Sequence, residues 1–498
     1  MNTATTRTLR FAGFLLALTA PAMAIAQGAA AAPERLSLSD AMRLAEQRST
    51  TLRIAEAGLS RARGQRYQAR SQLLPQVNGT AAYQRTLESQ FQAISKRADD
   101  GSGGGADTSS SGSDLANSPI AKIFAAPSTV ILGLTLTQNL FTAGKVTAAT
   151  KGAEAAERAA MAGVSSARAQ LVLEVAQAYY NATAADRMAS IADSTLAQAE
   201  RALNQTTLAR QVGTSAEFDL LRARVTRDNA RPQAIQAHAS RDIAYLRLRQ
   251  LLGVSLSGPM MLTTPVRDDL TAEQAMAQTA GTVLMAPVAL PRENSSATPD
   301  TTVNNRVAVK QAADALEAQR YALQAARWER LPSIQLSSNY QRFGYPADGT
   351  VLPNSFGLFY PNWTASMGIS FPVISSGRIK GDKMVAQANY MDAQQRLQQA
   401  REGAELDARV SISQYEQAQA TYAASAGTDE QAAKAYQIAE VRFREGVSTQ
   451  LELDQSRTQL QQARMNRVTA ARDFELARLR LALLRDLPLA GSPAGGTR

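Results

Sequence analysis

Residues 134–144 read LTLTQNLFTAG, and residues 367–377 read MGISFPVISSG. Each stretch begins with the alternation of apolar and small or polar residues that is typical of a strand and ends in a glycine turn. A shift of 233 positions superposes the two closing glycines, and the same shift pairs Gly213 with Gly446 far downstream. The chain therefore contains one long unit twice.

A helical hairpin of unusual length follows each glycine turn. The roughly 70 residues from Gly144 to Gly213 would span on the order of 100 Å if they were helical throughout. The returning helix of the second unit carries residues at spacings of three and four, which is the pattern of a coiled-coil seam. The pattern is the seven-residue column Leu453, Leu460, Arg467, Phe474 and Leu481, interleaved with Ala463, Ala470, Ala477 and Leu484. In the first unit, Pro232 is expected to kink the returning helix.

The part of each unit that precedes the hairpin is also repeated, at a shift of 257. Helical stretches over 36–73 and 306–330 each end in Leu-Pro, at Pro75 and Pro332, and a strand follows. The predicted strands are 76–86, 130–140, 333–344 and 363–374. We expect a signal peptide over 1–26, the first repeat over 27–253, a linker over 254–304 with one short helix near 271–281, the second repeat over 305–487 and a C-terminal tail over 488–498.

Composition excludes several kinds of chemistry. The 498 residues include no Cys and one His, and 53 Lys+Arg against 43 Asp+Glu give a net charge of +10. A chain without Cys has no disulfide and no thiolate site, and catalytic triads or multi-histidine metal sites would have to be built around His238 alone. The basic residues are spread along helices beside Glu and Gln, which favours solvated helix faces over a nucleic-acid site. We therefore expect no enzyme activity, no cofactor and no metal.

The four strands have the length and alternation of strands that cross a bilayer with lipid on one face and water on the other. The long connections, 87–127 and 345–362, fall on one side, and aromatic residues gather near the strand ends. A soluble half-buried sheet would show the same period. Because an open edge is not tolerated in lipid, a membrane barrel would have to be shared between chains. Two copies would give eight strands and three would give twelve, and only the larger barrel leaves an aqueous lumen.

This duplicated order of signal peptide, helix, Leu-Pro, strand pair, glycine turn and giant hairpin resembles the TolC family of outer-membrane efflux proteins. The resemblance covers about 36–487 and is most specific in the two quoted stretches and the paired tip glycines. It implies an α+β membrane fold in which three copies share a twelve-stranded β-barrel that continues into a helical tunnel. It further implies a homotrimer in the outer membrane of a Gram-negative bacterium, reaching into the periplasm. Its partners would be outer-membrane lipid, a periplasmic adaptor and an inner-membrane pump.

The resemblance also places the functional residues at the hairpin tips. The tip backbone and adaptor contacts would be Gly213, Ser215, Gly446 and Ser448, and the gate would comprise Asp219, Phe443, Ser448, Glu452, Asp454 and Gln455. Three copies of Glu452 would form a carboxylate ring that attracts cations. The family's second acidic position is Gln455 here, and Phe443 and Ser448 replace a hydroxyl donor and an arginine of the family's latch. We therefore expect a lock that is weaker or differently connected.

Two alternatives stay open beside a passive efflux duct. One is a structural or adhesive coiled-coil protein that is anchored in the outer membrane and conducts nothing. The other is an envelope enzyme, for which the sequence offers no convergent acid and base. Solvated acids at helix starts also remain an alternative explanation for Asp219, Glu452 and Asp454. The exported substrate cannot be read from these residues.

Overall fold

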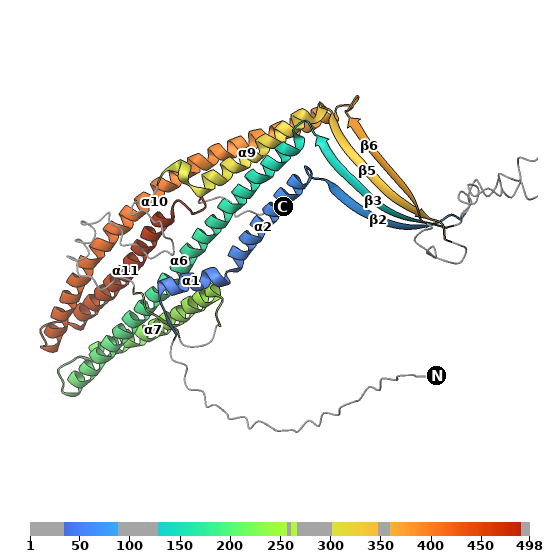
Figure 1. Ribbon diagram of the computed structural model, residues 1–498. Coiled ribbons are helices and arrows are strands. Elements are labelled where there is room, and N and C mark those ends of the chain that lie inside the picture. The colour runs from blue at the N-terminus through green and yellow to red at the C-terminus, as the bar shows by residue number, and fades with distance from the viewer. Residues whose placement is uncertain (1–33, 88–127, 256–259, 266–300, 347–358, 490–498) are drawn as a thin grey trace, which may run out of the picture.

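The computed structural model describes residues 34–87, 128–255, 260–265, 301–346 and 359–489. A four-stranded sheet lies at one end of an elongated molecule, and long helices extend from it to two hairpin tips at the other end (Figure 1). The expected signal peptide, the helix near 271–281 and most of the two long connections and of the C-terminal tail lie outside the described residues.

The sheet is antiparallel throughout, with the strand order β2-β3-β5-β6. Its strands are β2 (Gln76–Arg85), β3 (Ser128–Phe141), β5 (Ser333–Gly344) and β6 (Phe359–Ser370). The range predicted for β6, 363–374, is wrong at both ends by four residues. The strand ends at Ser370, two residues before Pro372, and it includes Pro361, which an edge strand can accommodate. Among the described residues, β2 and β6 each have one edge that pairs with no other strand.

The two giant hairpins are present and match in length. α6 (Lys145–Gln211) and α10 (Arg378–Arg444) each contain 67 residues, and α7 (Glu217–Leu252) and α11 (Gln450–Leu483) return from them. α7 continues through Pro232 as one helix, and the kink expected there stays a prediction. Of the predicted α11 column, Leu453, Leu460, Arg467 and Leu481 are buried. Within the described part of the chain, no helix has both the length and the apolar character needed to cross a membrane.

The helical stretch predicted over 36–73 is two helices, α1 (Leu38–Arg48) and α2 (Thr50–Ser71). The prediction of one helix is wrong because Ser49 leaves the helical region, at ψ 125°, and accepts a hydrogen bond from the Leu52 amide. Serine in that position caps the helix that follows it. In the second repeat, α9 (Val307–Arg327) and the short helix η2 (Trp328–Arg330) precede β5.

A small structure that the sequence did not predict ties the linker to the first repeat. β1 (Glu34–Leu36) pairs in parallel with β4 (Met260–Leu262), so the linker contains a strand. The buried Tyr179 hydroxyl on α6 donates to the Leu36 carbonyl and accepts from the Thr264 amide, both at 2.9 Å. The largest apolar core surrounds this point, halfway along the helices.

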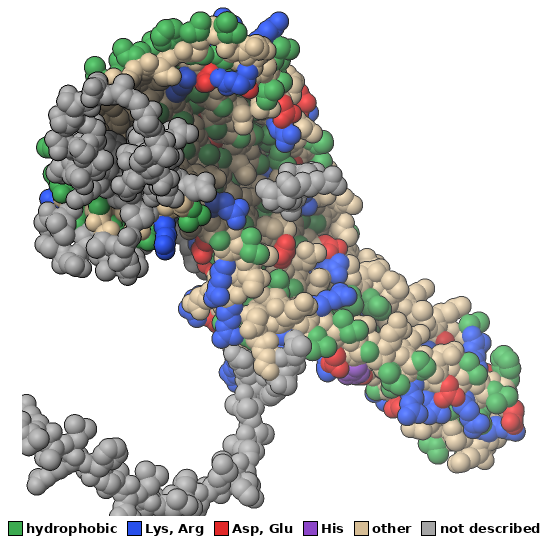
Figure 2. Space-filling model, turned by 90° about the vertical axis from the view of Figure 1, so that its right-hand side faces the viewer, with side chains coloured by type: hydrophobic (Ala, Val, Ile, Leu, Met, Phe, Trp, Pro, Cys, Tyr) green, Lys and Arg blue, Asp and Glu red, His purple; other side chains and the backbone are tan. Residues whose placement is uncertain are grey.

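The long helices form one curved wall in the order α2, α6, α9, α10 (Figure 1). α6 has a neighbour on both flanks, whereas α10 has α9 on one flank. From the sheet end, the space-filling view shows a curved body with hydrophobic side chains over its outer rim and a hollow beneath it (Figure 2). The single chain is therefore a segment of a wall with two open edges.

Candidate functional site at the hairpin tips

The two tips lie side by side at the end of the molecule farthest from the sheet (Figure 1). Each turn depends on a glycine in the left-handed region, Gly213 at φ +80° and Gly446 at φ +73°. The amide one residue after each glycine donates back to the carbonyl five residues earlier, at 2.8 Å in both tips. This bond is the glycine-based helix ending that satisfies carbonyls at a C-terminus.

Glu452 is held within its own hairpin. Its carboxylate accepts hydrogen bonds from Arg442 Nη1 at 2.8 Å and from the Ser448 hydroxyl at 2.7 Å, and its amide donates to Thr449 Oγ1 at 3.4 Å. The side chain is 42 % exposed. Arg442, at the end of α10, therefore neutralises the carboxylate that was expected to form a ring.

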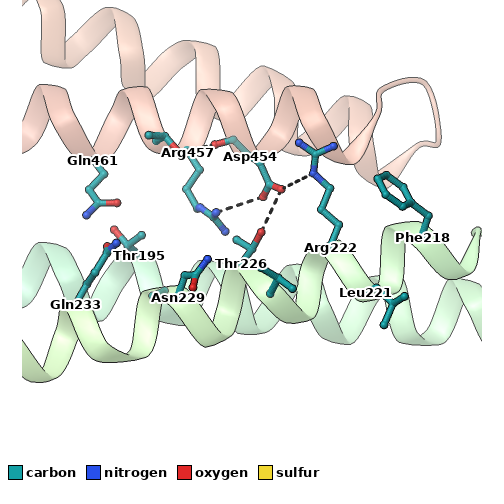
Figure 3. A pocket seen from close by; sticks show the side chains of 13 residues that line it. Thr195, Phe218, Leu221, Arg222, Thr226, Asn229, Gln233, Asp454, Arg457 and Gln461 are labelled. Atoms are coloured by element: carbon teal, nitrogen blue, oxygen red, sulfur yellow. Dashed lines mark hydrogen bonds and ion pairs between the residues drawn. The ribbon is translucent and has the colours of Figure 1, made fainter.

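Asp454 joins the two hairpins (Figure 3). One carboxylate oxygen, Oδ2, lies 3.6 Å from Arg222 Nε and accepts from Thr226 Oγ1 at 3.4 Å, and both of these residues belong to α7. The other oxygen, Oδ1, lies 3.3 Å from Arg457 Nη2 and 3.4 Å from Gln450 Nε2 on its own helix, α11. The side chain is only 13 % exposed, so solvent screens these contacts less than it would screen a surface pair.

A cavity of about 650 Å³ lies between the hairpins beside Asp454. Its α7 wall carries three apolar side chains, Phe218, Leu221 and Val225, which are exposed by 50 to 70 %. Asn229, Gln233 and Gln461 line the end farther from the tip (Figure 3). The site is thus a groove with one apolar wall and a charged link across it.

Solved structures share this arrangement of sheet, wall and paired hairpins. The sequence profile of the family described as Outer membrane efflux protein matches residues 41–254 and 298–485. The chain belongs to this family. It is the outer-membrane channel of a tripartite efflux system and extends into the periplasm. Members of this family are channels and not enzymes.

Three solved structures show the fold of the family in this chain. A membrane protein from Pseudomonas aeruginosa is 19% identical, with a TM-score of 0.67 over 91% of this chain and 93% of its own. VceC from Vibrio cholerae is 18% identical, with a TM-score of 0.66 over 90% and 95%. The MtrE channel of Neisseria gonorrhoeae, in its open state, is 21% identical, with a TM-score of 0.66 over 90% and 89%. The search of curated proteins gives no match.

The other residues predicted for the channel's gate do not contact one another in the described part of the chain. Asp219 is half-buried in the first turn of α7, and Gln455 is exposed on α11. Phe443 packs against the apolar cluster of the second hairpin, beside Tyr436, and burial raises the pKa of the Tyr436 phenol. Ser215 lies in the first tip turn. Of the predicted set, the described contacts join Ser448 to Glu452, and they join Asp454 to residues that the sequence did not single out.

The partners of Asp454 were missed for a physical reason. Arg222 and Thr226 lie more than 200 positions away, and the packing of α11 against α6, the partner of α7 in the first hairpin, brings them close to Asp454. The repeat pattern specifies each hairpin but not the rotation of one hairpin against the other. His238, the one histidine, lies on α7 with Nε2 2.9 Å from Asp193 Oδ1 on α6. The described residues form no group of three or more His, Cys, Asp or Glu side chains that could hold a metal ion.

Proposed function

We propose that three copies of this channel form one continuous duct, with a shared twelve-stranded barrel and a wall of helices below it. The two unpaired strand edges of each copy support this assembly, because unpaired backbone groups are not tolerated in lipid. Pairing β6 of one copy with β2 of the next would close the barrel. Four strands from each of three copies give twelve, whereas eight strands would leave an interior filled by side chains.

The periplasmic end of the duct would be closed by the hairpin tips. The observation that carries this proposal is the link from Asp454 on α11 to Arg222 and Thr226 on α7. Opening the end of a tapered tunnel requires the hairpins to move apart, and this motion breaks both contacts. The Thr226 hydroxyl donates a hydrogen bond to the carboxylate and Arg222 forms an ion pair with it; a shielded hydrogen bond to a charged group contributes about 1.5–3 kcal/mol. Asp454 is therefore the residue that we assign to the closed state.

The duct would work with a periplasmic adaptor and an inner-membrane pump. The apolar wall of the groove, formed by Phe218, Leu221 and Val225, supports an adaptor helix as the occupant, because amphipathic helices bind such grooves through apolar residues at this spacing. The two tip turns, with Gly213, Ser215, Gly446 and Ser448, lie at the same end. An adaptor that inserts between α7 and α11 would compete with the Asp454 link and so favour opening.

Single-channel conductance in planar bilayers tests the gate. We expect a small conductance from the wild type and, for Asp454→Asn, an open fraction that is about tenfold to a hundredfold higher, since each 1.4 kcal/mol is a factor of ten. Glu452→Gln is the matched control, because its partners lie within one hairpin. If Glu452→Gln opens the channel and Asp454→Asn does not, the closure is a carboxylate ring and our assignment is wrong.

A second function, a non-conducting anchor, makes the opposite prediction. An inserted assembly that conducts no ions in any of these variants would contradict the duct and support the anchor. Divalent cations added from the periplasmic side give an independent measure. A carboxylate ring would bind them and lose the block in Glu452→Gln, whereas closure by the Asp454 link predicts no block that depends on Glu452.

A further inference from the structure

The outer ends of two strands carry the same three residues. Residues 83–85 of β2 and residues 340–342 of β5 both read Tyr-Gln-Arg, and the shift between them is the 257 positions that relate the front parts of the two repeats. In each strand the residues before this triplet, 76–82 and 333–339, differ at every position. The triplet is therefore the part of the strand sequence that the two repeats share.

The triplet places its tyrosine and its arginine on the apolar face of the sheet. Arg342 lies opposite Leu132 in the register of β3 with β5, and the tyrosine two residues before it lies opposite Leu134. Successive side chains of a strand alternate between its two faces, so the glutamine of the triplet belongs to the polar face. The register of β2 with β3 places Tyr83 opposite Val130, on the same apolar face. A membrane barrel turns this face to lipid.

Both triplets lie at the end of the sheet that is farther from the helices (Figure 1). The helices extend into the periplasm, so this end of the sheet reaches the outer leaflet of the membrane. Arg85 and Arg342 are the charged residues of β2, β3, β5 and β6, and these four strands contain no acid. A lipid-facing arginine is most costly at the middle of the bilayer and costs little near its surface. The two arginines therefore lie at the depth of the lipid headgroups, and no carboxylate of the strands balances their charge.

Neighbouring aromatic rings hold Arg342 in place. Its Nε donates a hydrogen bond to the Tyr340 hydroxyl at 2.8 Å, and its guanidinium carbon lies 5.9 Å from the centre of that ring. Tyr340 packs edge-to-face against Trp363 on β6, with the ring centres 6.5 Å apart. The Trp363 indole donates to Ser338 Oγ at 2.9 Å and is 75 % exposed. The guanidinium is thus oriented by one ring and lies close to a second, exposed ring.

We propose that the two Tyr-Gln-Arg triplets bind the phosphate groups of a phosphorylated glycolipid in the outer leaflet. A guanidinium is planar, keeps its charge and binds phosphate oxygens through paired N–H donors, so an arginine fixed at headgroup depth suits a lipid phosphate. The exposed face of Trp363 offers an apolar surface on which a sugar ring can lie. A zwitterionic phospholipid carries its own cation and is attracted less strongly. Each site is complete within one chain, one at Arg342 and the other at the exposed Arg85.

Quenching of tryptophan fluorescence tests the Arg342 site, because the chain has only two tryptophans. In a Trp328→Phe chain, Trp363 reports alone from its place beside Tyr340. The protein is placed in phosphatidylcholine nanodiscs with a rising fraction of a diphosphorylated disaccharide glycolipid whose acyl chains carry bromine, which quenches indole fluorescence. We expect a preference for the glycolipid over phosphatidylcholine of about tenfold or more, since a hydrogen bond to a charged group is worth at least about a factor of ten in affinity. Arg342→Gln should abolish this preference.

Two control variants separate a phosphate site from a general effect of charge or of folding. Arg330→Gln removes an exposed arginine just before β5, at the opposite end of the sheet, and should leave the preference unchanged. Arg342→Lys keeps the positive charge without the planar pair of donors and should restore part of the preference. A preference that survives Arg342→Gln, or that Arg330→Gln reduces equally, would overturn the proposal.

The choice of lipid tests the site without a substitution near it. The dephosphorylated glycolipid should show no preference over phosphatidylcholine, and equal quenching by the two forms would contradict a phosphate site. Brominated phosphatidylglycerol preferred as strongly as the glycolipid would show a general attraction to anionic lipid and overturn the glycolipid assignment. Inorganic phosphate that relieves the quenching would overturn a lipid-borne ligand in favour of the free anion. Native mass spectrometry then tests the second site, because Arg85→Gln should remove one glycolipid per chain, and an unchanged number would refute the assignment of β2.

Discussion

Two equivalent glycines begin the two longest helices, and replacing each with alanine is expected to have unequal effects. Gly144 adopts φ +80° and Gly377 adopts φ +90°, a region that side chains with a Cβ atom rarely occupy. A Cβ atom on Gly144 would lie 2.5 Å from Cζ3 and 2.9 Å from Cε3 of the Trp328 ring, whereas one on Gly377 would meet nothing within 4 Å of it. An alanine at either site has the same unfavourable backbone conformation, and only an alanine at position 144 also clashes with a neighbouring side chain.

The magnitudes follow from these two contributions. An alanine in the left-handed region costs roughly 1–2 kcal/mol at either site. Forcing an extra carbon into a packed contact costs a further ~1–3 kcal/mol, because the indole ring must shift. We therefore expect Gly144→Ala to lower the free energy of unfolding by about 2–5 kcal/mol and Gly377→Ala by about 1–2 kcal/mol.

Denaturant unfolding in detergent, followed by far-ultraviolet circular dichroism, measures the difference. A third and a fourth variant, Trp328→Ala alone and with Gly144→Ala, complete a double-mutant cycle. In the Trp328→Ala background, Gly144→Ala should cost no more than Gly377→Ala does in the wild type. Equal costs for the two glycine substitutions in the wild-type background would refute the reasoning, since the clash would then contribute nothing.

Three other substitutions test two ion pairs of the second repeat and the pair of Lys145 with Glu329, which joins the two repeats. Asp407→Asn removes the carboxylate that lies 2.6 Å from the fully buried Arg306, so it should cost about 3–5 kcal/mol, whereas Asp392→Asn, in an exposed pair, should cost less than about 0.5 kcal/mol in the same unfolding assay. Equal losses of unfolding free energy in Asp407→Asn and Asp392→Asn would contradict the importance of the buried pair. The hydrogen bond from Lys145 is the main cause that lowers the pKa of Glu329, so the stability from this pair is present above the unfolded-state pKa and is lost as the pH falls through the folded-state value. Glu329→Gln should therefore flatten the acid side of the stability profile, and an unchanged acid side would count against the role of this pair.

The repeat pattern predicted most of the architecture, because the helix and strand before each hairpin repeat at a shift of 257 and the hairpins repeat at a shift of 233. The shift of 233 predicted two hairpins of one length, and α6 and α10 indeed have 67 residues each. The errors in the prediction, one helix in place of α1 and α2 and a linker without a strand, come from short-range features that the repeat does not show. Ser49 caps a new helix inside what had looked like one helical stretch, and the three-residue strands β1 and β4 are too short to show a period.

The candidate site was predictable only in part. The tip glycines were found because the shift of 233 pairs Gly213 with Gly446, and in the structure both adopt the left-handed conformation that favours glycine. Glu452 was identified by its distance from Gly446, but the arginine that neutralises it was not, since Arg442 lies on the opposite side of the turn. The link from Asp454 to Arg222 depends on how two hairpins pack together, and no spacing within either hairpin specifies that.

The central claim is that one chain is a third of a closed duct. Electron cryo-microscopy of the purified protein in detergent or nanodiscs tests it most directly through the symmetry of the particle and the density along its axis. We predict threefold symmetry, twelve strands in one barrel and a lumen that runs from the barrel into the helical tunnel and narrows at the tips. Particles of another symmetry, or a lumen filled by protein along the barrel, would contradict the account.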